Sequence, residues 1–77
     1  MDIYELHNLL HQLNYQSVDS FTLRYIEDHS ITIFIATWDR WIYFYDRKNK
    51  YYPRFDSIDE LLTFLETYNY GVLTCQK

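Results

Sequence analysis

Hydrophobic residues recur at helical spacing near both ends of the chain. The first set is Ile3, Leu6, Leu9, Leu10 and Leu13, and the second is Ile58, Leu61, Leu62, Phe64, Leu65 and Tyr68. A repeat of three to four positions marks the buried stripe of an amphipathic helix, so we predict helices over residues 2–14 and 58–70. Ser57 and Glu60 have the spacing of a capping box before the second helix, and Gly71 suits its C-terminal end.

Between the helices, hydrophobic and polar residues alternate with the period of two that is typical of half-buried strands. This pattern predicts strands over residues 18–26, 31–37 and 41–46. Residues 50–55 suit a short fourth strand. Pro53 places that strand at the edge of the sheet, because proline has no backbone N–H to donate.

These elements predict a single α+β domain over residues 1–77, in the order α-β-β-β(-β)-α. Short connections make neighbouring strands antiparallel, and two helices with one apolar stripe each can cover one face of a sheet of three to four strands. Residues 47–49 form a turn, in which Asn49 suits the left-handed backbone of a tight loop. Residues 72–76 either add a strand or lie over the core.

Strand alternation also divides the side chains between two faces of the sheet. In the first strand, Phe21, Leu23 and Tyr25 share one side. In the next two, we expect one face to carry Ile31, Ile33, Ile35, Ile42 and Phe44 under the helices, and the other to carry Phe34, Trp41, Tyr43 and Tyr45. An open face with this many rings is more than scattered surface apolarity, so it indicates a partner or a second copy of the chain.

The order helix, three strands, helix resembles that of the double-stranded-RNA-binding domain. That family places a cluster of lysines at the start of its last helix. Here the same place reads Asp56-Ser57-Ile58-Asp59-Glu60. The resemblance therefore concerns the order of elements, and it does not carry the family's function to this chain.

Composition points to one segment as the binding surface. Trp38 to Phe55 holds half of the chain's aromatic residues and five of its seven basic residues, although the whole chain has a net charge of −4. Tyr and Trp are the side chains that most often anchor interfaces. We therefore predict a binding surface that consists of Trp38, Arg40, Trp41, Tyr43, Tyr45, Arg47, Lys48, Tyr52 and Arg54.

Two histidines are the only candidates for a metal site. His7 and His11 stand four positions apart on the first predicted helix, a spacing that can grip one metal ion. The sequence identifies no third ligand beside them. We interpret both as solvated side chains and expect no metal site.

The remaining reactive residues have ordinary structural explanations. Cys75 is a single thiol near the C-terminal end of the sequence, and the acidic pairs at 27–28 and 59–60 suit a polar loop and the first turn of a helix. One glycine cannot build a glycine-rich phosphate loop. We expect no enzyme, no catalytic residue and no cofactor.

The sequence favours a small protein-interaction module of adaptor or inhibitor type, whose partner is another protein or a second copy in a homodimer. The alternative is a single-stranded nucleic-acid binder, because rings stack on bases while Arg and Lys contact phosphates. Gathering of the basic residues with the rings on one surface would favour nucleic acid, and a scattered arrangement would favour protein. The net negative charge of the chain makes nucleic-acid binding the weaker hypothesis.

Nothing in the sequence points to a membrane or to secretion. The longest apolar run is far too short to span a bilayer. Asp2 and Glu5 stand where a signal peptide would carry positive charge. We expect a cytoplasmic protein.

Overall fold

The computed structural model describes residues 3–36, 38 and 40–68. Its elements follow the order α1 (Ile3–His11), β1 (Tyr15–Asp19), β2 (Thr22–Tyr25), β3 (Ile31–Ala36), β4 (Trp41–Asp46), β5 (Arg54–Phe55) and α2 (Ile58–Thr67). The predictions for Gly71 and for residues 72–76 lie outside the described residues. None of the described helices has the length and apolar character needed to cross a membrane.

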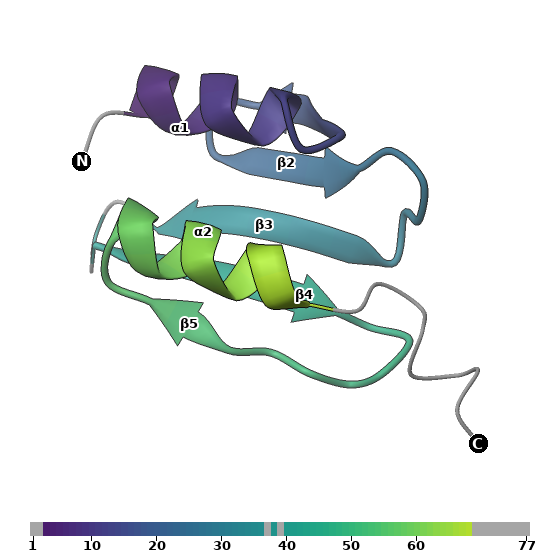
Figure 1. Ribbon diagram of the computed structural model, residues 1–77. Coiled ribbons are helices and arrows are strands. Elements are labelled where there is room, and N and C mark those ends of the chain that lie inside the picture. The colour runs from purple at the N-terminus through teal and green to yellow at the C-terminus, as the bar shows by residue number, and fades with distance from the viewer. Residues whose placement is uncertain (1–2, 37, 39, 69–77) are drawn as a thin grey trace.

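The strands form one antiparallel sheet in which neighbours in the sequence are neighbours in space, β1-β2-β3-β4-β5. Both helices lie on the same side of this sheet, α1 beside the first two strands and α2 in front of the third and fourth (Figure 1). The predicted α+β class is confirmed, with one strand more than the three to four expected. A five-stranded sheet also departs from the element order of the double-stranded-RNA-binding domain.

The additional strand arises because the segment predicted as one strand over residues 18–26 contains a turn. Ser20 and Phe21 form this turn between β1 and β2. The Asp19 carboxylate accepts a hydrogen bond from the Phe21 backbone N–H at 2.8 Å. A side chain that bonds the backbone two residues further on produces a tight turn without glycine.

The hairpin changes the environment of several predicted residues. Phe21 does not share a side with Leu23 and Tyr25, because it lies in the turn and is 42% exposed while both of the others are buried. The first helix ends at His11 rather than at residue 14. Asn14 then adopts a φ of 72°, which lets the chain reverse into β1.

The core lies between the helices and the covered face of the sheet. The register sets Ile33 between Leu23 of β2 and Phe44 of β4. The helices add four leucines to this layer, namely Leu6, Leu10, Leu61 and Leu65. All five residues predicted to face the helices from β3 and β4 are buried. Burial alternates strictly in β4, as predicted, whereas in β3 Thr32 and Ala36 on the other face are buried as well.

The second helix begins where the sequence indicated. The Ser57 hydroxyl accepts the Glu60 backbone N–H at 3.2 Å. This bond is the Ser57 half of the predicted capping box. The helix ends at Thr67, earlier than predicted, and Tyr68 follows in an extended conformation.

The connection between β4 and β5 contains the predicted turn with a different residue in the left-handed region. Lys50 has a φ of 54°, whereas Asn49 donates its backbone N–H and its side-chain amide to the Asp46 carboxylate, at 3.1 and 2.8 Å. After Pro53 the edge strand is only two residues long. A short edge strand with a proline beside it limits pairing with other chains.

Candidate binding surface

The helices leave one side of the sheet uncovered, and this side carries rings and arginines. Across β2 to β5 the register places nine residues there, which we call the open sheet face: Thr22, Arg24, Thr32, Phe34, Ala36, Trp41, Tyr43, Tyr45 and Arg54. None of the nine is acidic, and each of the four rings is half-buried. The predicted outward orientation of these rings is confirmed.

The guanidinium of Arg54 lies over an aromatic ring of this face. Its guanidinium carbon lies 4.2 Å from the centroid of the Trp41 ring, and Arg54 stands opposite Tyr43 in the β4–β5 register. Contact between a guanidinium and an indole is favourable by about 0.5–1 kcal/mol at an exposed site. This contact fixes a positive charge over the part of the face that β4 and β5 form.

A second positive region surrounds Thr32. Arg24 faces Thr32 across the β2–β3 register, and the Arg47 guanidinium donates from Nη1 to the Thr32 hydroxyl at 3.3 Å. Tyr45 faces Thr32 from the other neighbouring strand. Two arginines at neighbouring positions of this face suit a carboxylate or phosphate, because arginine can bind planar anions through paired N–H groups.

Aromatic contacts extend the surface beyond the strands. The ring centroids of Tyr43 and Tyr45 are 6.2 Å apart, and those of Tyr45 and Tyr52 are 5.9 Å apart. At the other end of the face, Trp38 lies 5.6 Å from Phe34. Trp38 is 74% exposed and Tyr52 is 53% exposed, so both rings offer contact area to a partner.

Two of the predicted surface residues lie away from the face. Arg40 is in the β3–β4 turn, with a φ of 63°, and its backbone N–H donates to the Ala36 carbonyl at 2.9 Å. Lys48 lies at the opposite end of β4, with its Nζ 3.3 Å from the Asp28 carboxylate. Hydrogen bonds from Ser30 and, secondarily, Lys48 hold the pKa of Asp28 below its usual value. The basic residues of the predicted surface are therefore divided among three places.

Arg24 is the charged residue of the open sheet face that the predicted binding surface did not include. It lies outside the aromatic and basic segment between residues 38 and 55. The available signal was the alternation of hydrophobic and polar residues along β2, which places Thr22 and Arg24 on the side of the sheet away from Leu23. The cross-strand register to Thr32 is what brings Arg24 to the rings.

The helix side of the molecule has the opposite charge. The exposed carboxylates there are Glu5, Asp56, Asp59, Glu60 and Glu66, and neither helix contains lysine or arginine. A hydrogen bond with Asp56, and then the charge of its carboxylate, raises the pKa of Glu60. We call this side the acidic helix layer, and the sheet separates it from the arginines of the open sheet face.

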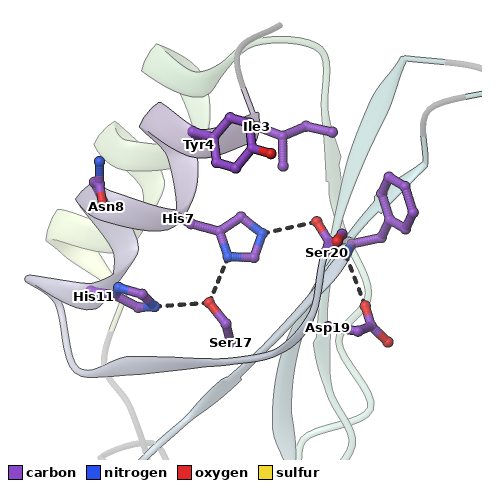
Figure 2. A pocket seen from close by; sticks show the side chains of 9 residues that line it. Ile3, Tyr4, His7, Asn8, His11, Ser17, Asp19 and Ser20 are labelled. Carbon is purple, nitrogen blue, oxygen red and sulfur yellow. Dashed lines mark hydrogen bonds between the residues drawn. The ribbon is translucent and has the colours of Figure 1, made fainter.

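A second feature lies in a groove of about 700 Å³ between α1 and the β1–β2 turn (Figure 2). Two ring nitrogens, His7 Nδ1 and His11 Nε2, lie 2.6 and 2.8 Å from the Ser17 hydroxyl oxygen. His11 is exposed, as expected of a solvated side chain, but His7 is half-buried. Sequence analysis missed Ser17 because β1, which carries it under the helix, was itself not predicted.

No protein-family model, curated protein or solved structure matches the chain. The fold by itself indicates no activity, since one fold serves many functions. Function is therefore inferred from the side chains of the surfaces described above.

Proposed function

We propose that this chain is a small non-enzymatic protein-interaction module, of adaptor or inhibitor type, that binds an acidic protein surface through its open sheet face. The proposal is carried by one observation: four half-buried rings and two arginines share that face with no carboxylate. Rings add contact area at low entropic cost because they have few rotatable bonds. Arginines add orientation, because each guanidinium pairs with a carboxylate in a fixed geometry.

The distribution of charge supports a protein partner over nucleic acid. Lys48 is paired with Asp28, and Arg40 lies at the other end of β4, so the basic residues form no continuous track along the rings. A single strand of nucleic acid needs such a track, since each nucleotide adds a phosphate. The carboxylates of the acidic helix layer also oppose the approach of a polyanion.

Single-stranded nucleic acid is the second candidate, and one observation favours it. Trp41, Tyr43 and Tyr45 follow one another along the open side of β4 with Arg54 beside them. Rings at alternate positions of an exposed strand can stack on successive bases while arginines contact phosphates.

A second copy of this chain is one acidic partner that the proposal includes. Its acidic helix layer could face the open sheet face of the first copy, with carboxylates opposite Arg24, Arg47 and Arg54. Such a contact joins two different surfaces and leaves one of each unoccupied, so it is heterologous. Sedimentation at low and high salt tests it, because charge-driven association between copies weakens as salt rises.

A titration with labelled single-stranded oligonucleotides at low salt separates the two candidates, because electrostatic binding is strongest there. We expect no tight binding. The matched variants are Arg47→Ala, whose guanidinium donates to Thr32 of the face, and Arg40→Ala, which lies away from it. Tight, salt-sensitive binding that Trp41→Ala or Arg47→Ala abolishes, and that Arg40→Ala leaves intact, would favour the nucleic-acid candidate and contradict the proposal.

We place this function in the cytoplasm. The lone thiol of Cys75 suits a reducing compartment, in which unpaired cysteines are common. Neither a cofactor nor a membrane is required for binding through the open sheet face.

A further inference from the structure

The groove between α1 and the β1–β2 turn, which we call the histidine groove, is separate from the open sheet face, since α1 covers the other side of the sheet. We propose that His7 and His11 bind a divalent late transition-metal ion in this groove, with Cu²⁺ and Ni²⁺ preferred to Zn²⁺. The basis is the convergence of one nitrogen from each ring on a single point, which the Ser17 hydroxyl oxygen occupies (Figure 2). Imidazole nitrogens four residues apart on a helix can reach one ion together.

A backbone carbonyl group orients the ring of His7 for metal binding. Its Nε2 lies 2.9 Å from the Ser20 carbonyl oxygen. A carbonyl can only accept a hydrogen bond, so Nε2 carries the proton and Nδ1 presents its lone pair to Ser17. Metal-binding histidines almost always donate their other N–H to a carbonyl, carboxylate or water, because that bond fixes the tautomer and the orientation of the ring.

The hydroxyl of Ser17 lies between the two histidines. With His7 Nδ1 as acceptor, the Ser17 O–H donates to it, and Ser17 Oγ accepts from His11 Nε2–H. When metal binds, the proton of His11 moves to Nδ1 by exchange with water, which the exposure of this ring permits. Both nitrogens then approach the ion to about 2.0–2.1 Å, and the Ser17 hydroxyl is displaced.

The ligand set determines which metals are favoured. Within residues 3–36, 38 and 40–68, no group of three or more His, Cys, Asp or Glu side chains could hold a metal ion. Two imidazoles are therefore completed by water, which enters through the open groove. A mixed nitrogen and oxygen set suits the tetragonal geometry of Cu²⁺ and Ni²⁺, whereas Zn²⁺ sites in proteins generally use three or four protein ligands.

Calorimetric titration with NiCl₂ tests the site. The protein should carry Cys75→Ser, because a free thiol binds such metals by itself. We expect one Ni²⁺ per chain and a loss of at least about tenfold in affinity for His11→Ala, a loss that even an outer partner of a metal ligand can cause. His29→Ala is the matched control, since His29 is an exposed histidine in the β2–β3 loop, and it should bind Ni²⁺ as tightly as the parent.

Magnetic resonance of the histidine rings gives a second readout that does not depend on heat. Bound Ni²⁺ should broaden the ring signals of His7 and His11 and leave those of His29 sharp. The proposal is overturned by the absence of saturable binding. It is overturned equally by full affinity in His11→Ala, by the same loss in His29→Ala, or by tighter binding of Zn²⁺ than of Ni²⁺.

Discussion

Asp46 is a buried carboxylate at the end of β4, on the side of the sheet that faces α2. It is 1% exposed and accepts hydrogen bonds from the Tyr68 hydroxyl and from Asn49. Burial by itself raises the pKa of Asp46, but the bonds from Tyr68 and Asn49 together outweigh burial and hold it below its usual value. Burial and the Asp46 carboxylate raise the pKa of Tyr68. This network ties the end of α2 to the β4–β5 connection.

Asp46→Asn should lower the free energy of unfolding by about 1–3 kcal/mol at pH 7, because the charged acceptor of buried donors is lost. The pKa of Asp46 is lower in the folded than in the unfolded chain, so the carboxylate's contribution is complete above about pH 4 and declines as the pH falls through the folded value. Urea denaturation at several pH values measures it. A difference between wild type and variant that is as large at pH 2 as at pH 7 contradicts this account.

Ser57 caps α2 through a single bond to the Glu60 N–H. Ser57→Ala should therefore lower the free energy of unfolding by about 1 kcal/mol. Thr63→Ala, an exposed change inside the same helix, controls for the general effect of alanine and should not destabilise. An unchanged denaturation midpoint in Ser57→Ala would show that this cap contributes nothing.

At the scale of elements, the sequence was informative where one face of a strand is fully buried. Residues 41–46 alternate strictly, and the structure has a strand with those bounds. The β1–β2 hairpin was missed because Val18 and Phe21 extend the apolar pattern across a turn that contains no glycine or proline. Its turn depends on the Asp19 side chain, and both Val18 and Phe21 are exposed. The hydrophobic pattern alone could therefore not reveal the turn between β1 and β2.

The two faces of β4 should respond differently to truncation. Phe44 is fully buried between the sheet and α2, and its ring centroid lies 5.0 Å from that of Phe64. Phe44→Ala should lower the free energy of unfolding by about 3–5 kcal/mol. Trp41→Ala should lower it by about 1 kcal/mol or less, because this ring is half-buried on the open sheet face and lies outside the core. Equal losses in chemical denaturation would mean that Trp41 belongs to the core.

Folding should not require a metal ion, because hydrogen bonds through Ser17 and Ser20 already join α1 to the β1–β2 hairpin. Addition of EDTA to the purified protein should leave its melting temperature unchanged. A fall of many degrees that Zn²⁺ reverses would instead make the metal a structural part of the fold.

At the scale of the whole molecule, the sheet separates two surfaces of opposite charge. The sequence located the rings and most of the basic residues, since they cluster between residues 38 and 55. It could not show that Arg40 and Lys48 lie away from the open sheet face. Arg40 is placed by the β3–β4 turn, and Lys48 is placed by its ion pair with Asp28. The cross-strand register added Arg24 from a distant part of the chain.

The central claim is that the open sheet face, rather than the acidic helix layer, binds a protein. Capture from a nuclease-treated lysate of the native host tests it with two matched charge reversals at exposed positions, Arg54→Glu on the face and Glu66→Arg on α2. We expect the wild-type chain and Glu66→Arg to retain the same protein, and Arg54→Glu to lose it. Equal retention by all three chains, or a protein that only Glu66→Arg loses, would contradict the claim.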